Sequence, residues 1–218
     1  MSLVSIIPAL EKNRYSKDGD LSSWGETNLL EWKISQLKLV NEVDRIIVST
    51  DSEKISEMAH KADVEVFKRD AAMSLSESLV YVCSRLSPND DVLWVNPTSP
   101  FLSPTTLSLL INEYFLHDKP NDGIVTSKKM HEYFFDENSP INFNDNAPTI
   151  SREGLSAVYT LTNAAYLANC RSVKARGRMF GQRPIFFETS WLASLEVRKS
   201  QDIDMFSSLI SKYFQEDV

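Results

Sequence analysis

Two aspartates separated by one residue, Asp202 and Asp204, are the clearest candidates for chemistry in this sequence. They lie late in the chain, after a first half in which expected strands and helices alternate. Mg²⁺ takes oxygen ligands and needs only one or two carboxylates when phosphates and water supply the rest. The pair therefore predicts a metal site for phosphoryl or nucleotidyl transfer. The alternative is a solvated turn or a cap before the last helix, because an isolated Asp-x-Asp is a weak signal.

The elements that would position this pair follow a strand–helix rhythm. Expected strands cover residues 4–7, 45–49, 64–67, 91–95 and 123–127, and expected helices cover residues 29–40, 53–59, 79–86 and 104–114. Thr50 and Glu53 have the spacing of a capping box, and Ser103-Pro104 has the hydroxyl and the proline of a helix start. Strands that alternate with helices predict parallel pairing with right-handed crossovers.

From about residue 128 the rhythm changes. Tyr133-Phe134-Phe135 is followed by a polar run over residues 136–146 and an apolar stretch over residues 156–161. This pattern predicts an antiparallel arm over about 130–160, a candidate dimerisation element. A last helix is expected over residues 206–214. With no linker or repeat in the sequence, we expect residues 1–218 to form one domain.

Composition argues against several classes of protein. The 218-residue chain has a net charge of −7, which argues against a general binder of nucleic acid or of anionic membranes. No stretch approaches the roughly 20 apolar residues that span a bilayer, and no signal-like leader precedes the first strand. The two cysteines, Cys83 and Cys170, make no disulfide framework, so we expect a reduced, cytoplasmic setting.

Six segments, taken in order, resemble the cytidylyltransferases that make CMP-activated acidic sugars. They cover residues 6–9, 45–51, 66–69, 96–100, 162–166 and 202–204, and include Asn96-Pro97-Thr98-Ser99-Pro100. The family is that of the acylneuraminate (CMP-sialic acid) cytidylyltransferases, with their legionaminic and pseudaminic acid relatives. The resemblance spans nearly the whole chain. It implies a Rossmann-like three-layer α/β/α sandwich with a mainly parallel sheet, of the nucleotide-diphospho-sugar transferase type, and ligands beyond the carboxyl ends of the strands.

The resemblance also implies an activity: transfer of CMP from CTP to the anomeric hydroxyl of an acidic 2-keto sugar, with release of pyrophosphate and Mg²⁺ as cofactor. The family implies a homodimer. By this match Asp202 and Asp204 are the metal-binding and catalytic pair. Arg69 and Asn96 match positions on the cytidine side. Their alternatives are a salt bridge from Arg69 to Asp70 or Glu65, and a turn-capping amide for Asn96.

The loop after the first expected strand departs from the family. Leu10 stands where the family has an arginine, Arg14 stands where it has a phosphate-binding lysine, and the loop glycines are absent. Arg14 can still bind phosphate through two donors, which makes it a catalytic and nucleotide-binding candidate. Lys12 and Lys17 are further nucleotide-binding candidates or solvated side chains. Glu11 adds a negative charge, which keeps a second hypothesis open: a non-catalytic member that binds a nucleotide or a partner without turnover.

The acceptor side is less specific. The basic candidates for a sugar carboxylate are Lys128, Lys129 and Arg152, which are otherwise surface charges, and Asn163 lies in the matched segment 162–166. Further basic residues form a local cluster that is either a solvated face or part of an anion pocket: Arg171, Lys174, Arg176, Arg178 and Arg183. A third hypothesis keeps the same chemistry with another nucleotide or sugar, such as a 3-deoxy-manno-octulosonate-type acid.

Overall fold

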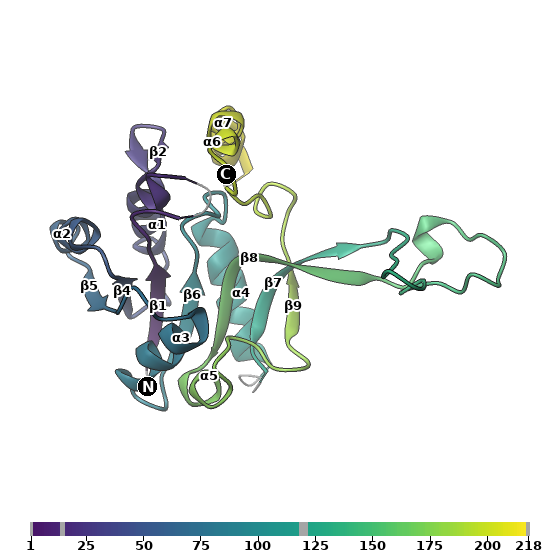
Figure 1. The fold of residues 1–218 in the computed structure, drawn as a ribbon, viewed down its shortest axis with the longest axis horizontal. Helices are drawn as coiled ribbons and strands as arrows, with labels where there is room; N and C mark the ends of the chain where they lie inside the picture. Colours follow the sequence, from purple (N-terminus) through teal and green to yellow (C-terminus); the bar gives the residue numbers. More distant parts are fainter. Residues whose placement is uncertain (1, 14–15, 118–121, 217–218) are drawn as a thin grey trace.

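A seven-stranded sheet forms the centre of the computed structural model, which describes residues 2–13, 16–117 and 122–216 (Figure 1). The strand order is β5-β4-β1-β6-β8-β7-β9. The bounds are β1 Leu3–Pro8, β4 Arg45–Thr50, β5 Glu65–Lys68, β6 Asp91–Val95, β7 Ile124–Met130, β8 Val158–Asn169 and β9 Ile185–Glu188. Neighbours from β5 to β6 are parallel, β8 is antiparallel to β6 and β7, and β9 is parallel to β7. The predicted mainly parallel sheet is confirmed.

Helices cover both faces of this sheet. Their bounds are α1 Leu29–Leu37, α2 Glu53–Lys61, α3 Leu75–Ser84, α4 Pro104–Leu116, α5 Cys170–Arg176, α6 Ser200–Ser207 and α7 Ile210–Glu216. Buried residues of α1, α2 and α4 share one core with the sheet, and those of α3 and α5 share a second core. The chain therefore has the predicted three layers. None of the described helices combines the length and the apolar character needed to cross a membrane.

Each central strand is buried on both sides, so its residues alternate between the two cores. Ile7 of β1 and Leu93 of β6 pack in the core that contains α1, α2 and α4. Their neighbours Ile6 and Trp94 pack in the core that contains α3 and α5. This alternation explains why the strands read as continuous apolar runs. It also leaves the polar residues of these segments at the strand ends, where they are free to form a site.

The helix starts are set by side-chain caps. The Ser103 hydroxyl accepts a hydrogen bond from the Thr106 N–H at 3.1 Å, so the predicted start of α4 is confirmed. The start of α2 was assigned to Thr50, which is wrong, because Thr50 is still paired in β4. The cap is Ser52, whose hydroxyl accepts from the Ile55 N–H at 3.3 Å. Two residues of extended chain thus separate the strand from the helix.

The end of the chain forms two helices where one was expected over 206–214. Helix α6 begins at Ser200 and α7 ends at Glu216, with a break around Leu209. Phe206 of α6 and Tyr213 of α7 both enter a third apolar cluster. This cluster includes Trp24 of the separate β2–β3 hairpin (Ser23–Trp24 and Thr27–Asn28). One straight helix is replaced because both aromatic residues bury against the same surface. The matched pair Asp202–Asp204 therefore lies inside a helix.

Strands β7 and β8 continue beyond the sheet as a two-stranded ribbon, which Figure 1 shows projecting from the body. Their last pairing joins Met130 to Val158, and the residues between form the arm, including the short 3₁₀ helix η2 (Arg152–Gly154). Within the arm, the rings of Tyr133 and Phe135 lie edge-on to Phe143, with centroids at 4.8 and 5.0 Å. The antiparallel arm is present as expected, and its role in dimerisation stays a prediction.

Candidate functional site

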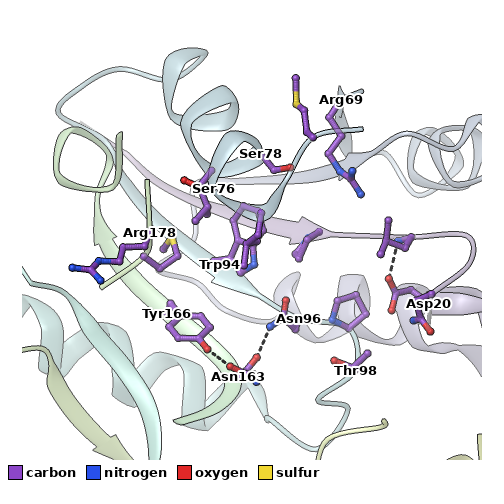
Figure 2. A pocket seen from close by; sticks show the side chains of 18 of the residues that line it. Asp20, Arg69, Ser76, Ser78, Trp94, Asn96, Thr98, Asn163, Tyr166 and Arg178 are labelled. Carbon is purple, nitrogen blue, oxygen red and sulfur yellow. Dashed lines mark hydrogen bonds between the residues drawn. The ribbon is translucent and has the colours of Figure 1, made fainter. Parts of the chain in front are cut away.

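A cavity of about 820 Å³ opens at the carboxyl ends of β1 and β6, in the range of small-molecule sites (Figure 2). Pro8 ends β1, Asn96 directly follows β6, and Arg69 directly follows β5. The lining also includes Leu10, Asn13, Asp20, Met73, Ser76, Ser78, Leu79, Trp94, Thr98, Asn163, Tyr166, Arg178, Met179, Phe180 and Glu196. Segments from both halves of the chain therefore meet at the edge of the sheet where parallel α/β folds bind ligands.

The loop after β1 is closed by Leu10 and Asp20. The Leu10 N–H donates to Oδ2 of Asp20 at 2.8 Å, and the Asp20 N–H donates to the Leu10 carbonyl at 2.9 Å. Gly19 has a φ of +49°, and a Cβ there would lie 2.2 Å from the Leu10 oxygen, so the closure requires glycine. Burial raises the pKa of Asp20 to about 6, against the opposing effects of the Leu10 bond and the positive charge of Arg69. The loop thus presents a weakly acidic buried carboxyl group.

Arg69 is held at the cavity by both its backbone and its side chain. Its N–H donates to the Thr50 carbonyl at 2.9 Å, and its guanidinium lies 3.5 Å from Oδ1 of Asp51. The side chain is only 9% exposed. Glu65, a suggested alternative partner, pairs instead with Arg45 at 2.8 Å. Because a guanidinium has five N–H donors, this ion pair leaves Arg69 able to bind an anionic or carbonyl oxygen of a ligand.

Strand β8 is distorted where it passes the cavity. Its register with β7 shifts between Val125 and Ser127, and Asn163, opposite this shift, has a φ of +56° in the left-handed region. Distortions of this kind re-aim side chains beside binding sites. The Asn96 side-chain amide donates to the Asn163 carbonyl, and the Tyr166 hydroxyl donates to Oδ1 of Asn163 (Figure 2). These three residues are thus linked along the cavity wall through the backbone and the side chain of Asn163.

The cavity combines a flat apolar part with cationic ends. The rings of Tyr166 and Phe180 are nearly parallel, at 16°, with centroids 5.9 Å apart. Burial, with the negative charge of Glu196, raises the pKa of Tyr166 to about 12, so its hydroxyl stays protonated as a donor. Figure 2 shows Arg178 at one end of the cavity and Arg69 towards the other. Flat rings beside amides suit a heteroaromatic base, and the guanidinium groups suit phosphate.

Helix α1 holds the loop that carries Asn96. The Lys33 ammonium donates to the Ser99 carbonyl at 2.9 Å, and the Trp32 and Gln36 side chains donate to the Pro100 carbonyl at 2.7 and 2.9 Å. Lys33 is wholly buried, and burial lowers its pKa to about 7. Three side chains of one helix therefore fix the backbone of this loop at the cavity edge.

A family model described as cytidylyltransferase matches residues 20–189, well over half of the chain. The chain belongs to the cytidylyltransferase family. No curated protein sequence matches it significantly. The family match contains Arg69, Asn96 and Asn163, which the fold brings to one cavity.

Solved structures with the same fold include two kinds of cytidyl enzyme. One is 4-diphosphocytidyl-2C-methyl-D-erythritol synthase from Anaerococcus prevotii DSM 20548, with a TM-score of 0.70 and 16% identity over 96% of this chain and 98% of that one. A second structure of an enzyme with this name gives 0.69 and 14%, over 96% and 99%. CMP:2-keto-3-deoxy-manno-octonic acid synthetase, solved with CTP, gives 0.73 and 10%, over 97% and 99%. These likenesses confirm the fold of this cytidylyltransferase family member.

The site residues predicted from the sequence divide into two groups. Arg69, Asn96 and Asn163 line the cavity together. Of the predicted phosphate-binding residues, Lys12 and Lys17 are exposed and are not among the described lining residues, and Arg14 lies outside the described residues. Among the described residues, the loop after β1 therefore lines the cavity through Leu10, Asn13 and Asp20, and the cations of the lining come from other segments.

The acceptor candidates also separate. Lys128 lines a second, smaller cavity beside the first. Arg152 lies on the arm, where its guanidinium pairs with Glu132 at 3.1 Å. Lys129 is exposed and lies 4.0 Å from Glu188. Of these three basic candidates, only Lys128 lines a cavity, while Asn163 lines the larger one. The basic cluster near α5 contributes Arg178 to the larger cavity.

Asp202 and Asp204 lie in the first turns of α6. Oδ2 of Asp202 accepts hydrogen bonds from the N–H groups of Arg198 at 2.7 Å and Lys199 at 2.8 Å, while Asp204 is exposed. Neither belongs to the described lining of the cavities, and no three His, Cys, Asp or Glu side chains of the described residues gather to hold a metal ion. For Asp202 this arrangement matches the capping alternative. The metal role of the pair stays a prediction.

Residues of the cavity that were not singled out from the sequence include Asp20, Trp94, Tyr166 and Glu196, whereas Arg178 belongs to the basic cluster named as a candidate anion pocket. Tyr166 lies in a matched segment, so that segment was its signal. Trp94 lies in the expected strand over residues 91–95 and is 4% exposed. Asp20 and Glu196 gave no signal, because each depends on a backbone turn that only the folded structure reveals. The nearest hint of the Asp20 turn in the sequence is Gly19, because glycine next to an acidic residue often occupies a turn with a positive φ.

Proposed function

We propose that this protein transfers CMP from CTP to an acidic 2-keto sugar of the sialic acid type and releases pyrophosphate. One observation carries the proposal: Arg69, Asn96 and Asn163, from three distant family-like segments, line one cavity at the carboxyl ends of the parallel strands. The family membership of the chain supports cytidylyl transfer as the reaction class. The name of one structural neighbour, a CMP:2-keto-3-deoxy-manno-octonic acid synthetase, supports an acidic sugar as acceptor.

The residues of the cavity suit the nucleotide half of this reaction. The rings around Trp94 and Tyr166 offer a face for the cytosine base, and the Asn96–Asn163–Tyr166 chain offers fixed amide and hydroxyl groups at its edge. Arg69 can neutralise phosphate charge as the α-phosphorus is attacked, and Arg178 adds a second cation at the other end of the cavity. The loop after β6, which side chains of α1 hold, keeps these groups in place. The protein would therefore act mainly by positioning and electrostatics.

Nucleotide binding is the first test. The midpoint of thermal unfolding is expected to rise with CTP and to rise less with UTP, ATP or GTP. Asn96→Ala is expected to abolish the preference for CTP, whereas Asn41→Ala, at an exposed residue away from both cavities, should leave it unchanged. Pyrophosphate release with a panel of eight- and nine-carbon 2-keto acids then tests turnover. A protein that prefers no nucleotide would contradict the proposal.

Mg²⁺ as cofactor, with Asp202 and Asp204 as its ligands, is part of the proposal that rests on the family resemblance. No step above depends on the metal. The test is to repeat the CTP shift with Mg²⁺ and with EDTA, in the wild type and in Asp204→Asn. If the pair binds the metal, the variant and the chelator should reduce the shift equally. If α6 uses the pair only for capping, Asp204→Asn should behave as wild type.

A second candidate is a member that binds nucleotide without turnover. The observation that favours it is the loop after β1: Lys12 and Lys17 are exposed, and Asp20 adds a buried carboxyl group to the cavity. A CTP-dependent thermal shift without pyrophosphate release for any acceptor in the panel would support this candidate. It would be contradicted by pyrophosphate release that requires both CTP and an acidic sugar.

We also propose that the arm over about 130–160 joins two copies into a homodimer in the cytoplasm. The exposed Phe135 and the half-buried ring of Phe143 give the arm an apolar surface away from the body. Phe135→Ser should convert a dimer into a monomer in analytical ultracentrifugation. A wild type that is monomeric at all accessible concentrations would contradict this part of the proposal.

A further inference from the structure

A second cavity of about 340 Å³ lies beside the larger one, and a single described residue, Glu196, lines both. The smaller cavity lies between β7, β8 and the segment that leads into α6. Its size is at the lower end of small-molecule sites. Two neighbouring cavities that share a carboxylate are what a transfer reaction between two substrates needs. The family match and the nucleotide site account for the larger cavity and leave the smaller one without an assigned ligand.

The smaller cavity has the chemistry of a polar, anionic ligand. Lys128 and Arg198 provide two cations, and Thr160 and Ser194 provide hydroxyl groups. Trp191, which is 56% exposed, provides a flat apolar surface at the rim of the cavity. Hydroxyl-rich walls suit the hydroxyl groups of a sugar, an exposed indole face suits its C–H groups, and paired cations suit a carboxylate.

Glu196 is held at the boundary by its neighbours. The Val197 N–H donates to the Thr98 carbonyl at 2.7 Å, which ties the segment to the loop at the larger cavity. Asp202 accepts from the N–H of Arg198, which anchors the other end to α6. The Arg198 guanidinium then donates from Nε and Nη2 to Oε2 of Glu196 at 2.8 and 2.7 Å. Both contacts use the same carboxylate oxygen, so Oε1 keeps lone pairs for another donor.

We propose that the smaller cavity binds the acidic sugar acceptor and that Glu196 is the general base for its attacking hydroxyl. Lys128 and Arg198 hold the sugar carboxylate, and the sugar extends towards Glu196 and the nucleotide. This inference rests on the proposed function and adds to it the acceptor site and a catalytic residue. The side chain of Glu196 is 14% exposed, so it is accessible from the cavities and yet fixed by Arg198.

The step balances within the two substrates. The hydroxyl oxygen of the sugar forms a bond to the α-phosphorus of CTP as the bond from that phosphorus to the β-phosphate oxygen breaks. Pyrophosphate leaves with the electron pair of that bond. The hydroxyl proton moves to Oε1 of Glu196, which passes it to water after the product leaves. Arg198 orients Glu196 before the transfer.

Binding tests the acceptor site independently of turnover. Isothermal titration with N-acetylneuraminate and with 3-deoxy-manno-octulosonate is expected to show binding of at least one acid, and a neutral sugar of similar size should not bind. Lys128→Gln and Arg198→Gln should each weaken the binding of the sugar acid by about tenfold or more, because each variant removes a charged hydrogen bond to it. Lys129→Gln is the matched control from the next position of β7, outside both cavities. Equal affinities in all four proteins, or no binding of either acid, would overturn the acceptor site.

Kinetics test Glu196. Glu196→Gln keeps the shape of the side chain and is expected to lower kcat by about 100-fold or more, with the CTP-induced thermal shift unchanged. The rise of kcat with pH on the acidic side should disappear in Glu196→Gln and persist in the control Glu188→Gln, an acid of β9 away from the cavities. An unchanged pH profile in Glu196→Gln would overturn the general base.

The outcomes separate this inference from the proposed function. If the wild type shows no CTP shift and no turnover, the proposed function fails. If CTP binds and turnover occurs, while Lys128→Gln and Arg198→Gln bind the acid as the wild type does, only the acceptor site fails. If the site holds and Glu196→Gln keeps full activity, only the general base fails.

Discussion

Two loops face the same cavity and are held in opposite ways. The loop after β6, which carries Asn96, is fixed from behind by a buried cation, Lys33. The loop after β1 is closed by a buried acid, Asp20. Burial moves the pKa of each group towards neutrality, down to about 7 for Lys33 and up to about 6 for Asp20. The family-like loop after β6 and the divergent loop after β1 thus each depend on a buried titratable group. The role of each group can be tested by measuring how the stability of the protein changes with pH.

The largest expected effect is at Lys33. The folded pKa is about 7 and the unfolded value is near 10.5, so the unfolded chain binds the extra proton between these values. Wild-type stability should therefore rise with pH across this window, by up to about 5 kcal/mol. Lys33→Met keeps the side-chain volume and removes the titration, so its stability relative to the wild type should increase as pH falls from 9.5 to 7. Urea unfolding at both pH values measures this, and parallel changes in the two proteins would contradict it.

Asp20 should make the stability of the protein change with pH in the opposite direction. Its folded pKa of about 6 lies above the ordinary value of 3.8, so the folded state retains a proton that the unfolded chain has lost between these pH values. Wild-type stability should fall as pH rises from about 4 to 6. Asp20→Asn keeps an oxygen for the Leu10 N–H and should be more stable than the wild type by about 3 kcal/mol at pH 7.5, with no gain at pH 3.5. Asp18→Asn, at an exposed neighbour, is the control.

A third effect concerns the turn that closes the divergent loop. Gly19→Ala would put a Cβ 2.2 Å from the Leu10 carbonyl oxygen at a φ of +49°, so the turn has to open. The expected cost is about 2 kcal/mol of unfolding free energy, with weaker binding of CTP. Gly25→Ala is the matched control: its φ is +59°, and its nearest neighbour is a side-chain atom at 3.9 Å. Equal costs for the two variants would show that backbone strain alone, and not the close contact, determines the effect.

The two loops also differ in how far the sequence predicts them. The loop after β6 was recognised because Asn96-Pro97-Thr98-Ser99-Pro100 follows an unambiguous buried strand, and a local motif at a strand end fixes its own place in a parallel sheet. The sequence does not predict that Lys33 supports it, because a lysine on an amphipathic helix is usually exposed. Its burial becomes visible only when α1 packs behind the loop.

The loop after β1 was predicted less well for a different reason. Its charged residues Lys12 and Lys17 fit the family's phosphate grip by order along the chain, yet backbone closure between Leu10 and Asp20 determines which side chains reach the cavity. Such a closure depends on long-range geometry, which residue type alone does not encode. For the same reason the sequence identifies the Asp202–Asp204 motif but does not predict that it lies within α6.

The smallest effect should come from the exposed lysines of the divergent loop. Lys12→Gln and Lys17→Gln are each expected to change the affinity for CTP by less than about twofold, because solvated charges away from a ligand contribute little. Arg69→Gln, at the cavity, should lower the affinity for CTP by about tenfold or more. Titration at two salt concentrations separates a direct contact from a distant one, since screening removes only the distant part. If either lysine variant loses as much affinity as Arg69→Gln, the loop must close over the nucleotide, and the two loops then share the work of binding it.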